Sequence, residues 1–138
     1  MRAAKAQGSL SDMANPNTDV VCVVDDDPSV LNAVVRLLSL AGWPVKEFSD
    51  PREFLLHVTI HGAAVAVIDV WMPLMNGLEV QSRLRDLSPS TRVIIVTGKS
   101  DSGIRSTALN GGASAFLTKP LDGEELLTAV RLARASAI

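Results

Sequence analysis

The chain has 138 residues, of which 47% are hydrophobic and 20% are charged, as expected for one soluble globular domain with a substantial core. Thirteen basic and fifteen acidic side chains give a formal net charge of −2, so a nucleic-acid-binding surface is not expected. The single cysteine, Cys22, excludes a disulfide framework and a cysteine-ligated metal site. No membrane-spanning stretch and no secretory signal are recognisable, which predicts a cytoplasmic protein.

Strands and helices are predicted to alternate along the chain after a loose tail at residues 1–18. Buried apolar runs predict five strands, at residues 20–24, 45–48, 65–69, 92–96 and 113–118. Helical apolar periods and caps predict five helices, at residues 28–41, 51–60, 77–87, 101–110 and 123–134. Such alternation with short connections is typical of right-handed βαβ units. We therefore predict one α/β domain over residues 19–138, with a parallel sheet covered by helices on both faces.

Several helices have recognisable N-terminal caps. Asp27 and Asp50 are each followed by proline, the residue favoured at the first helical position. The last helix is expected to begin with a capping box between Asp122 and Glu125. These signals give Asp27 and Asp50 a local structural role, and no metal-binding role is expected for Asp27.

Four of the five predicted strands end in polar residues. Asp25 and Asp26 follow the first strand, and Asp69 ends the third. Thr97 follows the fourth strand and Lys119 follows the fifth. Because the carboxyl ends of parallel strands meet at the same edge of a sheet, we expect these side chains to form one pocket.

The residue types in this pocket indicate phosphate chemistry. Three neighbouring carboxylates repel one another unless a cation neutralises them, and an all-oxygen ligand set favours Mg²⁺ over zinc. Lys119 and Thr97 are suited to bind phosphate oxygens. A carboxylate held beside the metal can itself be phosphorylated, and Asp69, on the central strand, is the best candidate for that nucleophile.

Four segments resemble the signature segments of a known family. They are VVCVVDDDP at residues 20–28, VIDVWMPLMNG at 67–77, VIIVTG at 93–98 and FLTKP at 116–120. Each lies at the end of its own predicted strand, and together they resemble the CheY-like receiver domain of two-component response regulators. The resemblance covers about residues 20–134. It implies a flavodoxin/CheY-like fold with strand order 2-1-3-4-5.

The resemblance assigns roles to individual residues. Asp69 matches the phosphoacceptor, which receives a phosphoryl group from a phosphohistidine on a sensor histidine kinase or phosphotransfer domain. Asp26 matches the carboxylate that binds Mg²⁺ directly, and Asp25 the one that acts through water. The backbone carbonyl of Trp71 is expected to complete the metal site. Lys119 matches the phosphate-binding lysine, and the family has a cis peptide bond directly after it.

The resemblance also implies a switch formed by Thr97 and Phe116. The Thr97 hydroxyl is expected to turn toward the phosphate, and the Phe116 ring to rotate inward behind it. The fourth helix, at residues 101–110, suits this role because glycine and serine in its body give it a shallow energy minimum. Partners are expected to contact the fourth helix, the fifth strand and the fifth helix.

The expected partners are the phosphodonor protein, an output domain or effector, and a second copy in a phosphorylation-dependent homodimer. The chain is expected to be either a stand-alone receiver or the N-terminal part of a transcription regulator. It would catalyse only its own phosphorylation and dephosphorylation, so no enzyme in the ordinary sense is expected. Direct binding of this segment to nucleic acid or to a membrane is not expected.

Two residues near the predicted site depart from common choices in the family. Trp71 is bulky where small or polar residues are frequent, and Lys99 follows Thr97 by two residues. In the family these places govern the access of water and of the phosphodonor. We therefore hypothesise that the Trp71 ring shields the acyl phosphate on Asp69 and lengthens its lifetime.

Three other functions are alternatives to the receiver. A receiver-like adaptor that acts without phosphorylation differs only in detail, although the intact acidic set disfavours it. A Mg²⁺-dependent phosphatase with an aspartyl nucleophile would need a second carboxylate where Trp71 stands. A nucleotide-binding domain would need glycines in place of the acidic residues 25–27. His57 and His61 are expected to face solvent, without a phosphodonor role.

Overall fold

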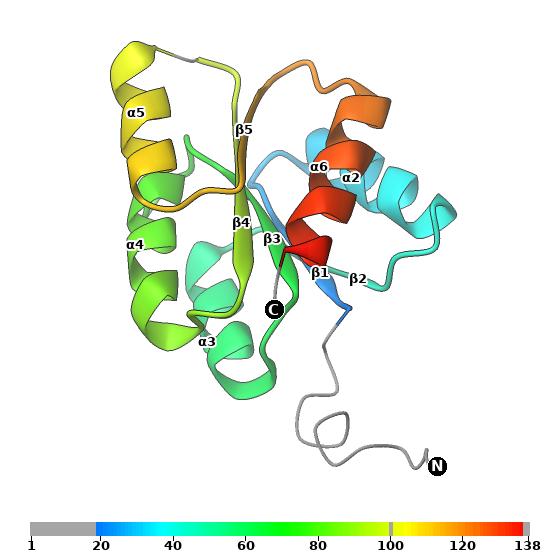
Figure 1. Cartoon of the computed structure of the whole chain (residues 1–138), viewed down its shortest axis with the longest axis horizontal. Helices are drawn as coiled ribbons and strands as arrows, with labels where there is room; N and C mark the ends of the chain where they lie inside the picture. The colour runs from blue at the N-terminus through cyan, green and yellow to red at the C-terminus, as the bar shows by residue number, and fades with distance from the viewer. Residues whose placement is uncertain (1–18, 100, 137–138) are drawn as a thin grey trace.

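The computed structural model describes residues 19–99 and 101–136, which form alternating strands and helices (Figure 1). The strands are β1 (Val21–Val24), β2 (Val45–Phe48), β3 (Val65–Asp69), β4 (Arg92–Thr97) and β5 (Ala115–Thr118). The helices are α2 (Pro28–Leu40), α3 (Pro51–His61), α4 (Gly77–Leu87), α5 (Ser102–Asn110) and α6 (Gly123–Ala135). The predicted tail at residues 1–18 lies outside the described residues.

The five strands form one parallel sheet in the order β2-β1-β3-β4-β5. This confirms the predicted fold class and strand order. Helices α2 and α6 cover one face of the sheet, and α3, α4 and α5 cover the other (Figure 1). Within the described ranges, no helix is both long and apolar enough to cross a membrane.

Two hydrophobic cores, one on each face, explain why the central strand is apolar without interruption. Val65 and Val67 of β3 belong to the core under α2 and α6. Ala66 and Ile68, which alternate with them, belong to the core under α3, α4 and α5. Because successive side chains of a strand point to opposite faces, burial on both faces requires every position to be apolar. Asp69 then follows at the edge where this burial ends.

The predicted boundaries differ from the structure at a few ends. β5 begins at Ala115 and not at Ala113, because the Ala113 N–H closes the end of α5 by donating to the Ala108 carbonyl at 3.0 Å. The Asp122 carboxylate caps α6 by accepting from two backbone amides, which is one half of the predicted capping box with Glu125. The full capping box occurs at α4 instead, where Asn76 and Glu79 cap each other reciprocally.

Helices α4 and α5 are joined near the C-terminal end of α5. The Gln81 side chain on α4 is buried, and its Nε2 donates to the Ala108 carbonyl at 2.8 Å. Arg85, one turn further along α4, donates to the Gly111 carbonyl at 3.3 Å. A buried amide without a partner would be costly, so the Gln81 contact fixes the last turn of α5 against α4.

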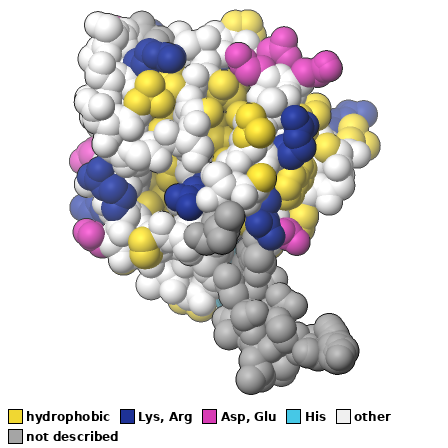
Figure 2. Space-filling view, viewed as in Figure 1, with side chains coloured by type: hydrophobic (Ala, Val, Ile, Leu, Met, Phe, Trp, Pro, Cys, Tyr) yellow, Lys and Arg dark blue, Asp and Glu magenta, His cyan; other side chains and the backbone are white. Residues whose placement is uncertain are grey.

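Charged side chains are dispersed over the surface that Figure 2 displays. Lys and Arg side chains are scattered there and do not form one continuous basic area. This distribution agrees with the weak net charge of the sequence. The face in view therefore lacks the concentrated positive charge that a phosphate backbone requires.

Gly77 allows α4 to begin directly against the end of β3. Its N–H donates to the Val70 carbonyl at 2.8 Å. A Cβ atom on residue 77 would overlap the Asp69 carbonyl oxygen and lie 2.9 Å from the Asp69 carbonyl carbon. Because backbone cannot move aside as a flexible side chain can, only glycine fits at this position.

We predict that Gly77→Ala destabilises the protein by about 2 kcal/mol or more, since the added methyl group must displace the backbone at Asp69. Urea denaturation measures this difference. Gly123→Ala is the matched control, because its Cβ would lie 3.5 Å from Leu37 in ordinary contact. The control is expected to be neutral or stabilising by up to about 1 kcal/mol. Equal stability of Gly77→Ala and the wild type would contradict the close approach.

Candidate functional site

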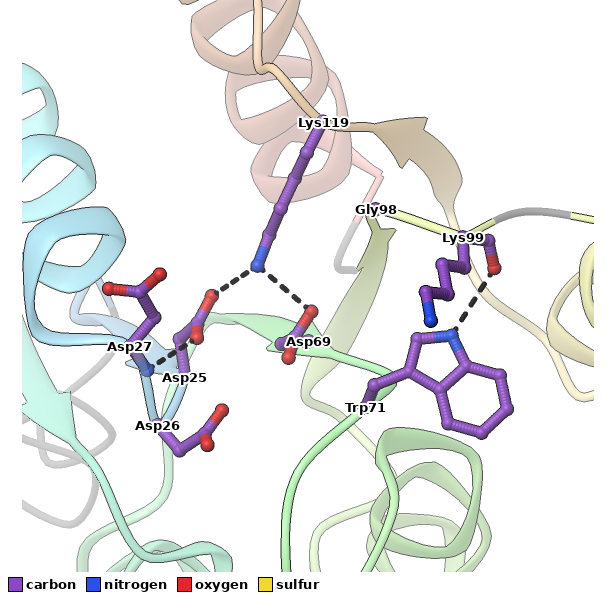
Figure 3. A pocket seen from close by; sticks show the side chains of 8 residues that line it. All are labelled: Asp25, Asp26, Asp27, Asp69, Trp71, Gly98, Lys99 and Lys119. Carbon is purple, nitrogen blue, oxygen red and sulfur yellow. Dashed lines mark hydrogen bonds and ion pairs between the residues drawn. The ribbon is translucent and has the colours of Figure 1, made fainter.

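The carboxyl ends of β1, β3, β4 and β5 surround one cavity of about 550 Å³. Figure 3 shows its lining, which consists of Asp25, Asp26, Asp27, Asp69, Trp71, Gly98, Lys99 and Lys119. The parallel sheet therefore places the strand-end carboxylates and the lysine around one cavity, as the sequence predicted. Thr97 and Phe116 are not among the lining residues.

Lys119 is the centre of the polar contacts in this cavity. Its Nζ donates to Asp25 Oδ2 at 2.9 Å and lies 3.1 Å from Asp69 Oδ1 (Figure 3). Both carboxylate side chains are only 5% exposed, whereas the Lys119 side chain is 21% exposed. The peptide bond between Lys119 and Pro120 is cis, as the resemblance implied. One ammonium group thus bridges two buried carboxylates from different strands.

Three carboxylates form a cluster that could hold a cation. Oxygen atoms of Asp25, Asp26 and Asp69 all lie within 4.8 Å of one another. Asp25 and Asp69 are buried, and Asp26 is exposed. Among the residues that the structure describes, the Asp26 carboxylate has no hydrogen bond or ion pair, so it is available to a ligand. An oxygen-only set with one accessible carboxylate fits a hard divalent cation.

The electrostatics of the cavity act on Asp69 and Lys119. Burial, and next the neighbouring charge of Asp25, raise the pKa of Asp69 to about 6, although Lys119 opposes this shift. Burial lowers the pKa of Lys119, but hydrogen bonds and charges from Asp25 and Asp69 outweigh it, so the net shift is upward. The Lys119 ammonium therefore stays charged, while the Asp69 carboxylate is ionised at neutral pH and binds a proton more readily than an ordinary aspartate.

Thr97 is fully buried at the end of β4, and its hydroxyl is bound to the next loop. Its Oγ1 donates to the Lys99 carbonyl at 3.0 Å and accepts from the Lys99 N–H at 3.1 Å. Trp71, which is 51% exposed, donates from its indole Nε1 to the same carbonyl at 3.2 Å. That the backbone carbonyl of Trp71 binds the metal stays a prediction. The sequence drew attention to Trp71 and Lys99, but not to this bond.

Phe116 is partly buried on β5, and a residue that the sequence analysis missed lies over it. The guanidinium carbon of Arg105 on α5 is 5.7 Å from the centre of the Phe116 ring, a cation–π distance. Arg105 therefore links α5 to the predicted switch aromatic. No sequence signal identifies this pair, because the contact depends on how α5 lies against β5.

Asp27 and the two histidines have mainly local contacts. Asp27 lines the cavity, but its Oδ1 accepts from the Ser29 N–H at 2.9 Å as the predicted cap of α2. His57 is not fully solvent-facing as predicted: it is partly buried, with its ring centre 5.2 Å from that of Phe48. Its position on α3 places it over Phe48 at the edge strand β2. His61 is exposed, with its ring centre 4.7 Å from that of His57.

Cys22, the single cysteine, is fully buried in β1. Burial raises the pKa of its thiol to about 12. The thiolate is the reactive form of cysteine, so this side chain is chemically inert at neutral pH. Its role is confined to core packing.

Solved structures share the fold of this chain. A CheY-like response regulator receiver domain protein from Methanospirillum hungatei JF-1 superposes with a TM-score of 0.82 at 26% sequence identity, over 86% of this chain and 95% of that chain. The beryllofluoride-activated NtrC4 receiver domain, a dimer in solution, gives a TM-score of 0.83 at 28% identity, over 87% of this chain and 99% of that chain.

Sequence comparison agrees with the structural one. The response regulator protein TmoT of Ectopseudomonas mendocina is 38% identical over 119 residues, which are 86% of this chain and 54% of TmoT. The chain spans about half the length of the curated relatives that it matches. The sequence profile of the response regulator receiver domain matches residues 21–131. The fold and the strand-end carboxylates agree with these matches, and the chain belongs to the response regulator receiver domain family.

Proposed function

We propose that residues 19–138 form a receiver domain that accepts a phosphoryl group on Asp69 from a phosphohistidine of a sensor histidine kinase or phosphotransfer domain. The observation that carries this proposal is the position of Asp69: it is buried at the end of the central strand, yet lines an open cavity with Asp25, Asp26 and Lys119. A buried carboxylate beside an ammonium group is a suitable nucleophile for phosphorus.

In the proposed transfer, an oxygen of the ionised Asp69 carboxylate forms a bond to phosphorus. The phosphorus–nitrogen bond of the donor phosphohistidine breaks, and its electron pair stays on the imidazole, which leaves as a neutral ring when its other nitrogen is protonated. Lys119 Nζ, which already lies 3.1 Å from Asp69, is placed to bind the transferred phosphoryl oxygens. Hydrolysis of the acyl phosphate by water would return Asp69 to its carboxylate form.

Asp25, Asp26 and Asp69 would hold Mg²⁺, with the Trp71 carbonyl as a further ligand. Their oxygen donors and the free Asp26 carboxylate support this assignment. When bound, Mg²⁺ supplies positive charge that offsets the repulsion between the carboxylates and the incoming phosphoryl oxygens. Burial, and next the charge of Asp25, raise the pKa of Asp69, so added positive charge beside this carboxylate would favour its ionised form.

The response to phosphorylation would pass through Thr97 and Phe116 to the surface formed by α5, β5 and α6. The contacts of Thr97 with the loop after β4, and of Phe116 with Arg105, support this route. An output domain, an effector protein or a second copy of the chain would bind that surface. The matched region makes up only about half of the curated relatives, which supports an output domain in the whole protein. The chemistry would be confined to phosphorylation and dephosphorylation of the protein itself.

The test of this function is intact mass after incubation with acetyl phosphate. We expect a single phosphoryl adduct that requires Mg²⁺ and is absent from Asp69→Asn. Asp27→Asn is the matched control, because Asp27 lines the same cavity but caps α2, and this variant should still form the adduct. An adduct that persists in Asp69→Asn would identify another acceptor. No adduct in a wild type that binds Mg²⁺ would favour the phosphorylation-independent adaptor.

We predict that Asp69→Asn stabilises the metal-free protein near pH 8 by about 1–3 kcal/mol, because it removes a buried charge whose pKa is raised to about 6. The advantage should shrink as the pH falls through 6 and vanish below the usual value of 3.8, where Asp69 is protonated both folded and unfolded. Urea denaturation across this pH range measures the difference.

Asp86→Asn, an exposed carboxylate near the end of α4, is the control and should show no such pH-dependent difference. Added Mg²⁺ should raise the unfolding free energy of the wild type more than that of Asp69→Asn, since binding to the folded state stabilises it. A stability of Asp69→Asn at or below that of the wild type near pH 8 would show that the Lys119 ion pair outweighs burial.

We predict that Trp71→Ala accelerates loss of the phosphoryl group from Asp69 by about two- to tenfold, because the large ring that lines the cavity would restrict the access of water to the acyl phosphate. The decay of the phosphorylated mass after removal of acetyl phosphate gives the rate. Leu74→Ala, in the same loop but outside the cavity lining, should decay like the wild type. An unchanged rate in Trp71→Ala would exclude shielding by this ring.

A further inference from the structure

One backbone oxygen joins the two loops that border the cavity. The Lys99 carbonyl accepts from Thr97 Oγ1 at 3.0 Å and from Trp71 Nε1 at 3.2 Å. Trp71 lies in the loop after β3, which carries Asp69, and Lys99 lies in the loop after β4, which carries Thr97. Figure 3 shows the indole pointing away from Asp69 toward this carbonyl, on one side of the cavity. A carbonyl oxygen has two lone pairs, and both are used here.

These contacts occupy the Thr97 hydroxyl. Threonine has one hydroxyl proton, and while Thr97 donates it to Lys99, it cannot donate it to a phosphoryl oxygen on Asp69. The Lys99 N–H also donates to Thr97 Oγ1, at 3.1 Å. Rotation of Thr97 toward the cavity must therefore break two hydrogen bonds with the same residue.

Trp71 fixes the position of Lys99 from the other side. The Lys99 side chain is exposed, and within residues 19–99 and 101–136 its backbone has hydrogen bonds only with Thr97 and Trp71. Half of the Trp71 surface is exposed, so the indole is not held there by complete burial. Its N–H is the group that ties the Asp69 loop to the Lys99 carbonyl.

We propose that the Trp71 indole N–H is a positioning group that holds the Lys99 carbonyl within reach of the Thr97 hydroxyl and so opposes the turn of Thr97 toward Asp69. This inference rests on the proposed phosphorylation of Asp69. It assigns the N–H a role separate from shielding by the ring. The N–H stabilises the unphosphorylated arrangement, whereas the ring prolongs the lifetime of the phosphoryl group. Loss of the N–H alone favours the phosphorylated arrangement.

Trp71→Phe separates the two roles, because it removes the N–H and keeps an aromatic ring. The control is Trp43→Phe, which changes the other tryptophan, next to the hydrophobic core under α2 and α6. The probe is beryllofluoride with Mg²⁺, an analogue of the aspartyl phosphate that does not turn over, so shielding against hydrolysis does not enter. ¹H–¹⁵N NMR titration gives the affinity, and amide hydrogen exchange in the unliganded protein reports the Lys99 N–H.

We expect Trp71→Phe to bind beryllofluoride about two- to tenfold more tightly than the wild type, the effect of losing one hydrogen bond that favours the unliganded arrangement. The Lys99 amide should exchange faster in unliganded Trp71→Phe by a similar factor. Trp43→Phe should match the wild type in both measurements. An affinity that is unchanged or lower in Trp71→Phe overturns the proposal, whatever the exchange rate.

Failure of the proposed function gives a different result. If the wild type binds no beryllofluoride, phosphorylation of Asp69 is in doubt, and the exchange rate in the unliganded protein alone decides the role of Trp71. Faster exchange of the Lys99 amide in Trp71→Phe than in the wild type would then support the positioning role of the Trp71 N–H. An unchanged exchange rate would contradict it. As a further readout, Trp43→Phe leaves Trp71 as the sole tryptophan in a chain without tyrosine, so its fluorescence should change when beryllofluoride displaces the contact.

Discussion

The ion pairs of Lys119 with Asp25 and Asp69 are the interaction on which the site depends. Two carboxylates, each 5% exposed, face each other across the ends of neighbouring strands, and one ammonium group lies between them. Without that cation, the buried charges would repel one another at the edge of the sheet. The raised pKa of Asp69 shows that the compensation is partial. The cavity is therefore held together while still attracting additional positive charge.

The two hydrophobic cores hold the strands that carry these charged residues in place. β1, β3 and β4 are buried on both faces and paired along their lengths, which places Asp25, Asp69 and Thr97 together at one edge of the sheet. Gly77 lets α4 close against the end of β3, directly behind Asp69. Burial ends near Asp69 and Thr97, since Trp71, Gly98 and Lys99 in the loops that follow are exposed. A buried nucleophile thus lies beside an exposed rim.

Apolar runs, helix caps and strand-end charges are sufficient to predict the parallel α/β sheet, the caps of α2 and α3, and the meeting of Asp25, Asp26, Asp69 and Lys119. The strand order follows only from the resemblance to the receiver family. The sequence could not reveal the contact of Trp71 with Lys99, 28 residues away, since the acceptor is a backbone carbonyl common to every residue. The pairing of Arg105 with Phe116 likewise depends on the packing of α5. The prediction that His57 faces solvent is wrong because the periodicity of α3 does not reveal that Phe48 of the edge strand β2 lies against its ring.

The hydrogen bonds between α5 and α4 determine how α5 can move. Its last turn is fixed to α4 through Gln81 and Arg85, whereas its first turn begins only a few residues after Thr97. Near its start α5 has the packing of Ile104 against the core and the ring contact of Arg105, whereas its hydrogen bonds to α4 lie at its C-terminal end. The C-terminal end is therefore the expected pivot of this helix, which is about 14 Å long. Movement that starts at Thr97 would tilt α5 more than translate it. The surface displacement would then be largest around residues 102–105, where Arg105 contacts Phe116.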